Sequence, residues 1–122
     1  MSDVRTVVVK EIESIDHAKV YYTLRQVHVR LISDDTVRAV KVFIALRKFG
    51  MTVVTTHMFH GFYGTTPANV VSLLHRLGDK GILTLVKNMK PGVFRYCLSE
   101  KFWSLWTAQQ SSSSSTQQSI NT

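Results

Sequence analysis

The sequence contains a single cysteine, Cys97, among its 122 residues. One cysteine cannot form a disulfide within the chain, and this scarcity is typical of proteins that work in a reducing compartment. No run of apolar residues approaches the ~18 needed to cross a bilayer. Residues 1–13 also lack the apolar stretch and small-residue cleavage site of a signal peptide. We therefore expect an intracellular, cytoplasmic protein that does not enter a membrane.

Acidic residues are nearly absent from the middle of the chain. Residues 36–98 hold nine lysines and arginines and a single acid, Asp79, whereas residues 1–35 hold five basic and six acidic residues. The net charge of +7 therefore arises almost entirely from the middle of the chain. This concentration favours a polyanionic partner, with nucleic acid ahead of an anionic membrane. A basic surface with no dedicated partner is the alternative.

Enzyme motifs are missing as well. The sequence has no glycine-rich phosphate loop, no local Ser-His-Asp signature and no acidic pair in its basic half. His57, His60, His75 and Cys97 include zinc-ligating residue types, but no second cysteine pair supports the His57-x-x-His60 spacing. We expect a protein that is not an enzyme and that has no metal, no cofactor and no small-molecule substrate.

The two ends of the chain differ from the middle. Residues 108–122 are Ser, Gln and Thr with little apolar content, which predicts a disordered tail. Residues 4–12 are rich in β-branched side chains, and residues 27–31 alternate between apolar and polar, so both segments favour strands. Positions 20, 24, 27 and 31 also fit one face of a helix. We favour strands and expect residues 1–33 to form a β extension packed on the main domain.

From residue 33 onward the local signals predict a series of helices followed by a hairpin. Capping candidates at residues 33–35 and an apolar stripe predict a helix over Asp35–Phe49, which Gly50 ends. A short helix over Val53–Phe59 follows. Thr66-Pro67 then marks a helix start, because threonine caps well and proline is harmless at the first position. Strands over 82–88 and 93–98, joined by Met89–Gly92, and a last helix over Ser99–Thr107 complete the series.

The stretch Thr66–Leu83, TPANVVSLLHRLGDKGIL, resembles the recognition helix of winged helix-turn-helix proteins, and the hairpin after it looks like their wing. The resemblance covers residues 35–98, and small regulators of archaea and their viruses are similar. It implies an α+β fold in which a three-helix core carries a β-hairpin wing. The domain would span residues 34–107, including the short C-terminal helix. The implied function is sequence-specific binding of double-stranded DNA in transcription regulation, in the host cytoplasm if the protein is viral.

The helix that Thr66 begins has a face suited to a DNA groove. Its apolar stripe points inward, so small and hydrogen-bonding side chains near its start point outward, where they could approach base edges. Asn69 could pair with adenine, and Arg76 could reach a phosphate or a guanine. Free N–H groups at the helix start suit phosphate, and basic wing residues suit the backbone or the minor groove. The expected DNA-binding residues are Thr65, Thr66, Ala68, Asn69, Ser72, Arg76, Lys87, Lys90 and Arg95.

The last predicted helix carries a large aromatic load in Phe102, Trp103 and Trp106. These side chains either close the domain's own core or form a dimer interface, and we expect a homodimer because two-fold partners read paired half-sites. Two other functions remain open. One is a winged helix that binds another protein in a replication or transcription assembly, and the other is an architectural protein that binds DNA of any sequence.

Overall fold

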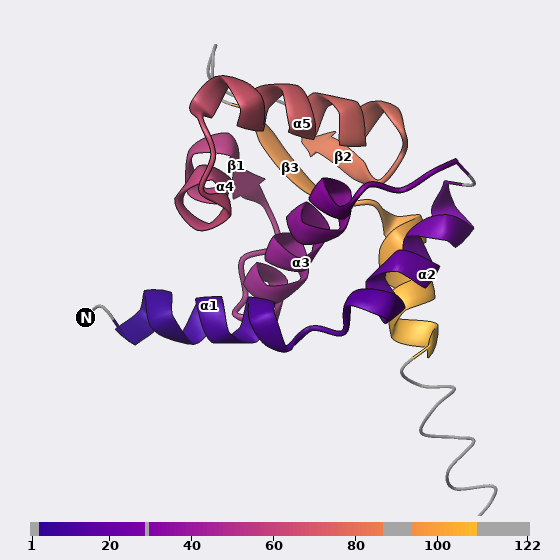
Figure 1. Cartoon of the computed structure of the whole chain (residues 1–122), viewed down its shortest axis with the longest axis horizontal. Coiled ribbons are helices and arrows are strands. Elements are labelled where there is room, and N and C mark those ends of the chain that lie inside the picture. The colour runs from indigo at the N-terminus through magenta and orange to yellow at the C-terminus, as the bar shows by residue number, and fades with distance from the viewer. Residues whose placement is uncertain (1–2, 29, 87–93, 110–122) are drawn as a thin grey trace, which may run out of the picture.

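The computed structural model describes residues 3–28, 30–86 and 94–109, and within them the fold is α+β (Figure 1). Six helices accompany a small antiparallel sheet in the described residues. In chain order the elements are α1 (Asp3–Ser14), α2 (His17–Val27), α3 (Asp34–Lys48), β1 (Val54–Thr55), α4 (Thr56–Tyr63), α5 (Pro67–Asp79), β2 (Leu83–Val86), β3 (Arg95–Leu98) and a C-terminal helix over residues 100–109.

The N-terminal segment is helical, so the prediction of a β extension over residues 1–33 is wrong. In α1 the buried Val8 and the half-buried Ile12 lie one turn apart and join the core cluster, and α1 packs on α3. In α2 the fully buried Val20 and Leu24 have the same spacing. Packing of these helical faces overrides the strand preference of β-branched residues, which is weak and depends on context. The two helices are separated by Ile15 and Asp16, and the Asp16 carboxylate caps α2 by accepting a hydrogen bond from the Ala18 N–H at 3.0 Å.

Helix α3 lies at the centre of the molecule, between α1, α2, α4 and the sheet (Figure 1). It begins and ends one residue earlier than predicted, and of the capping candidates Ser33 is the one that caps it, since its hydroxyl accepts a hydrogen bond from the Thr36 N–H at 3.2 Å. Gly50 follows its end with φ of 91°, a left-handed conformation that glycine adopts without strain. Because neighbouring elements cover α3 on several sides, its buried residues extend beyond the single apolar stripe that the sequence predicted. The buried residues are Thr36, Val37, Ala39, Val40, Val42, Phe43, Ile44, Ala45 and Leu46.

Helix α4 begins three residues later than expected and ends four residues later. The sequence predicted Val53–Phe59, but Val54 and Thr55 form β1, and the Thr55 hydroxyl caps α4 by accepting a hydrogen bond from the Met58 N–H at 3.1 Å. Phe59, fully buried in α4, stacks on Tyr63 at 4.9 Å and contacts Phe43 of α3 at 5.4 Å between ring centroids. These contacts fix α4 against α3.

The three strands form one antiparallel sheet with the order β1-β3-β2. The predicted hairpin is confirmed in its strands, which pair Leu83 with Leu98 and Leu85 with Tyr96, while its turn at 89–92 lies outside the described residues. Strand β1 pairs Val54 with Tyr96 on the other side of β3. Tyr96 is therefore the centre of the sheet, and it is 1% exposed.

The C-terminal helix follows β3 and lies beside α2 (Figure 1). The Ser99 hydroxyl accepts a hydrogen bond from the Phe102 N–H at 3.2 Å at its start. Near its end the Gln109 amide donates to the Thr23 hydroxyl of α2 at 2.7 Å. Residues 108 and 109 thus belong to this helix and not to the predicted tail, and residues 110–122 lie outside the described residues.

Cys97 provides a test of the packing around β3. Burial raises the pKa of its thiol, while the nearby Arg47 guanidinium acts in the opposite direction and lowers it less. The thiol is therefore protonated at neutral pH, and its reaction with iodoacetamide is expected to accelerate continuously from about pH 7 to pH 9, as thiolate forms. The rate should stay below that of glutathione throughout. A rate that levels off near neutral pH would contradict this environment.

Candidate nucleic-acid interface

The outward face of α5 carries the side chains that the sequence predicted for it. Val70, Leu73, Leu74 and Leu77 are buried toward the core. On the opposite side of the helix, Ala68, Asn69, Ser72 and Arg76 are exposed. The face is polar near the helix start and cationic toward its end. A face of this kind can approach another polar surface closely without burying an apolar patch.

The start of α5 is held by a network of hydrogen bonds. The Thr66 hydroxyl caps the helix by accepting from the Asn69 N–H at 3.3 Å, and Pro67 follows at the first helical position. The Asn69 side-chain amide donates to the Thr65 hydroxyl at 3.4 Å. This last contact restrains the Asn69 side chain and leaves its carbonyl oxygen without a hydrogen-bond partner among the described residues.

A polar hollow of about 330 Å³ lies beside this face, between the start of α3, the end of α4 and α5. Its members include two residues that are not among the predicted DNA-binding residues, Arg38 and Tyr63. The Arg38 guanidinium lies 4.8 Å from the centre of the Tyr63 ring and 3.6 Å from the Asp35 carboxylate. The lining residues are Asp35, Arg38, Tyr63, Gly64, Thr65, Asn69, Ser72, Leu73 and Arg76.

The charges of this polar hollow favour an anion. Arg38 and Arg76 contribute two guanidinium groups against the single carboxylate of Asp35. The Asp35–Arg38 pair is solvent-exposed, with side chains 70% and 57% accessible, so its contribution to stability is small and the guanidinium is available to a ligand. Guanidinium groups match phosphate oxygens in geometry as well as charge.

Tyr63 forms a neutral wall of the polar hollow. Burial raises the pKa of its phenol, Asp35 raises it further, and Arg38 and Arg76 act in the opposite direction. The phenol therefore remains protonated at physiological pH and donates a hydrogen bond to the Asp35 backbone carbonyl at 3.3 Å. This bond ties α4 to the start of α3 and fixes the ring under the Arg38 guanidinium.

On its other side, α5 is joined to β3 through His75. The His75 Nδ1 and the Tyr96 hydroxyl are 3.3 Å apart, and the imidazole packs edge-on against Phe94, with 5.1 Å between ring centroids. Arg95, predicted to lie on the wing, is half-buried in β3, where it precedes Tyr96 and points to the opposite face of the sheet. Lys87 and Lys90, the other predicted wing contacts, lie outside the described residues.

The basic residues of the middle segment do not all gather around α5. Lys48, at the far end of α3, pairs with Glu11 of α1 at 3.1 Å, and Arg47 lies 4.0 Å from the centre of the Trp103 ring. These two cations face the N-terminal and C-terminal helices. Part of the positive charge that the sequence concentrates in residues 36–98 therefore lies at the end of α3 away from α5.

The aromatic residues of the C-terminal helix serve mainly the chain's own core. Phe102 is fully buried, Trp106 is 5% exposed, and the two rings stack at 6.1 Å. Trp103 is half-buried beneath Arg47. Of the two interpretations that the sequence left open, a core role accounts for Phe102 and Trp106, because neither exposes enough surface to form a dimer interface.

His57 and His60 lie on α4, exposed and half-buried respectively. Within residues 3–28, 30–86 and 94–109, no three potential metal ligands come together. None of the helices in the same residues is long and apolar enough to cross a membrane.

Comparison with protein-family models, with curated proteins and with solved structures finds no match to this chain.

Proposed function

We propose that this protein binds double-stranded DNA through the outward face of α5, as a sequence-specific transcription regulator of the winged helix-turn-helix type. The observation that carries the proposal is the row of exposed polar side chains on α5 beside a hollow lined by two arginines. The element order α3–β1–α4–α5–β2–β3, with the sheet order β1-β3-β2, is the arrangement expected of a winged helix. In that arrangement α5 is the recognition helix and β2 and β3 form the base of the wing.

In this proposal each group has a distinct role. The B-DNA major groove admits one α-helix, and the small residues Ala68 and Ser72 allow α5 to approach the base edges. The Asn69 amide supplies the donor and acceptor that pair with adenine. Arg76 and Arg38 flank this reading surface and bind phosphates, which fix the position of the helix along the duplex.

A homodimer that reads two half-sites is part of the proposal, since a single helix contacts few base pairs. Phe102 and Trp106 are buried within the chain, so the dimer would use another surface.

The experiment selects bound sequences from a random duplex library with the full chain and measures their affinity by fluorescence anisotropy at several salt concentrations. We expect one enriched sequence, bound at least about a thousandfold more tightly than random duplex. The affinity should fall steeply as salt rises, because phosphate contacts release counterions.

Two other outcomes would replace the proposal. Salt-sensitive binding without any enriched sequence would indicate an architectural DNA-binding protein. An absence of duplex binding, together with purification of a defined protein complex, would indicate a protein-interaction module.

A further inference from the structure

A second hollow lies next to the polar hollow, between α1, α3 and α4. Its volume is about 220 Å³, and we call it the α1 hollow. Arg38 and Tyr63 line both hollows, so the Arg38 guanidinium, which lies over the Tyr63 ring, belongs to the wall between them. Helix α3 lies between α5 and α1 (Figure 1). The two hollows therefore adjoin, and together they extend from α5 across α3 to α1.

Basic side chains follow this path from one helix to the next. Arg76 and Arg38 line the polar hollow, and Arg38 and Lys41 line the α1 hollow. Arg38 and Lys41 are three residues apart on α3, so they lie on the same side of that helix. On α1 the Arg5 guanidinium lies 5.6 Å from the centre of the Phe62 ring, which also lines the α1 hollow. We call the four basic residues of α1, α3 and α5 the cationic strip.

The acids beside the cationic strip neutralise it only in part. Asp35 pairs with Arg38 at 3.6 Å, and both side chains of that pair are exposed to solvent. Glu13 lines the α1 hollow and has no ion pair among the described residues. The other three cations of the strip have no carboxylate partner in the part of the chain that the structure describes. The strip therefore keeps an excess of positive charge.

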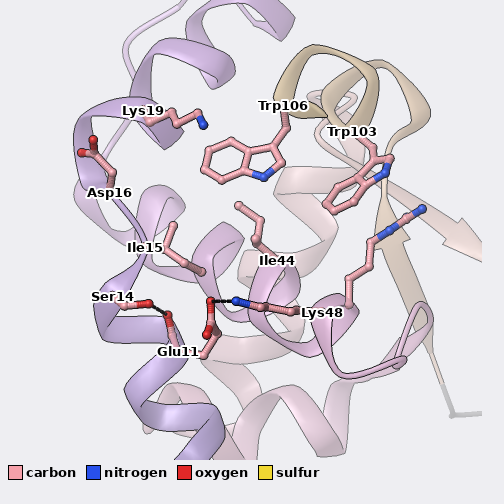
Figure 2. Close-up of a pocket in the computed structure, with 10 residues that line it drawn as sticks. Glu11, Ser14, Ile15, Asp16, Lys19, Ile44, Lys48, Trp103 and Trp106 are labelled. Atoms are coloured by element: carbon pink, nitrogen blue, oxygen red, sulfur yellow. Dashed lines mark hydrogen bonds and ion pairs between the residues drawn. The ribbon is translucent and has the colours of Figure 1, made fainter. Parts of the chain in front are cut away.

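The hollow at the other end of α3 differs from these two in the surroundings of its cations (Figure 2). It has a volume of about 560 Å³ and lies between the α1–α2 junction, the end of α3 and the C-terminal helix. There Lys48 pairs with Glu11 at 3.1 Å, and the Lys19 ammonium lies 4.8 Å from the centre of the Trp106 ring. These cations are already held by groups of their own chain, so a polyanion gains less from them than from the cationic strip.

We propose that the cationic strip binds the phosphate backbone of the same duplex that α5 reads. The inference rests on the proposed function and extends its contact surface from α5 to α3 and α1. A duplex fits the strip because it carries one negative charge for about every 1.7 Å of its axis, whereas the strip presents cations from three successive helices. Phosphate contacts position a protein without reading bases, so the strip contributes affinity and orientation and leaves the sequence preference to α5.

The test uses the full chain and the duplex selected with it. The double variant Arg5→Gln with Lys41→Gln removes two charges of the cationic strip and keeps polar side chains in their place. We expect its affinity to fall at least about tenfold, and the slope of log affinity against log salt concentration to fall by about two, because each phosphate contact contributes about 0.9 to that slope. The enriched sequence should stay the same, because phosphate contacts carry no base information.

The double variant Lys10→Gln with Lys101→Gln is the matched control. Lys10 is exposed on α1 and Lys101 is exposed on the C-terminal helix, and neither lines either hollow. The change in net charge is the same, so the affinity should stay within about twofold of that of the unaltered chain if position matters. Equal losses in the two double variants would show that only the overall charge counts and would overturn the proposal. Urea unfolding midpoints show that both variants are folded.

Glu13→Gln tests the cationic strip in the opposite direction. It removes an acid from the α1 hollow, so the duplex should bind about threefold more tightly, a gain that a damaged fold cannot produce. Glu100→Gln is the control, since Glu100 is an exposed acid at the start of the C-terminal helix. Equal affinities of these two variants would overturn the proposal and leave duplex binding by α5 intact. A failure of the unaltered chain to bind any duplex would overturn the proposed function and this inference together.

Discussion

The Phe59→Ala variant is expected to lose about 3–5 kcal/mol of unfolding free energy. Phe59 is fully buried, stacks on Tyr63 and contacts Phe43, so its removal leaves a cavity between α3 and α4. Collapse into that cavity is restricted, because neighbours cover α3 on several sides. Since small domains are stable by only about 5–15 kcal/mol, the loss should be visible as a large shift of the urea midpoint.

Phe49→Ala is the matched control for this variant. Phe49 is the same residue type at the end of α3, but it is 43% exposed. Its replacement removes little buried surface and should cost less than about 1 kcal/mol. Similar losses in the two variants would mean that the Phe59 ring does not join the two helices.

Duplex binding is expected to fall most when Asn69 and Arg76 are both replaced by alanine. A good pairwise contact to a base contributes about 1–3 kcal/mol, and the lost phosphate contact of Arg76 adds to the loss at Asn69, so the double variant should bind the selected sequence about a hundredfold or more weakly. Asn69→Ala alone should relax the preference at one base pair. Arg76→Ala alone should weaken binding to all duplexes equally, because Arg76 binds a phosphate. It should also lower the slope of log affinity against log salt concentration by about one.

Arg25→Ala is the control for the charge removed at Arg76. Arg25 is an exposed arginine on α2, a helix that packs on α3 and not on α5, and its hydrogen bond and its ring contact among the described residues are both with Tyr21. Anisotropy should give an affinity within about twofold of that of the unaltered chain, because a remote surface charge is largely screened by salt. If the double variant binds as tightly as this control, α5 is not the reading element.

The elements that the sequence predicted best are those whose ends are marked by nearby residues, such as helix caps and glycines. Ser33 and Thr66 cap their helices with the side-chain oxygens that their residue types suggest, and Gly50 ends α3 in a left-handed conformation. The two strands of the hairpin, on either side of Pro91 and Gly92, were also predicted correctly. Such signals depend on residues a few positions apart, so they can be read without knowledge of the rest of the fold.

The predictions that failed depended on distant contacts. Residues 4–12 favour a strand by composition, yet α3 supplies the surface on which Val8 packs as part of a helix. The extension of the apolar pattern to Leu31 was misleading, since Leu31 is 89% exposed after the end of α2. In the candidate site, Arg38 and Tyr63 were missed because they come from α3 and α4 and meet α5 only in the folded chain.

The contacts of His75 with Phe94 and Tyr96 have a mechanical consequence. They join α5 to the central strand of the sheet, and β1 and β2 are paired to that same strand. Rotation of α5 would therefore break these contacts unless the sheet moved with it, so we expect the helix and the strands to move together. A duplex lying along α5 would meet the base of the hairpin at a fixed distance and angle. The spacing between two contacts along the nucleic acid would then be set by the backbone and not by the rotamers of individual side chains.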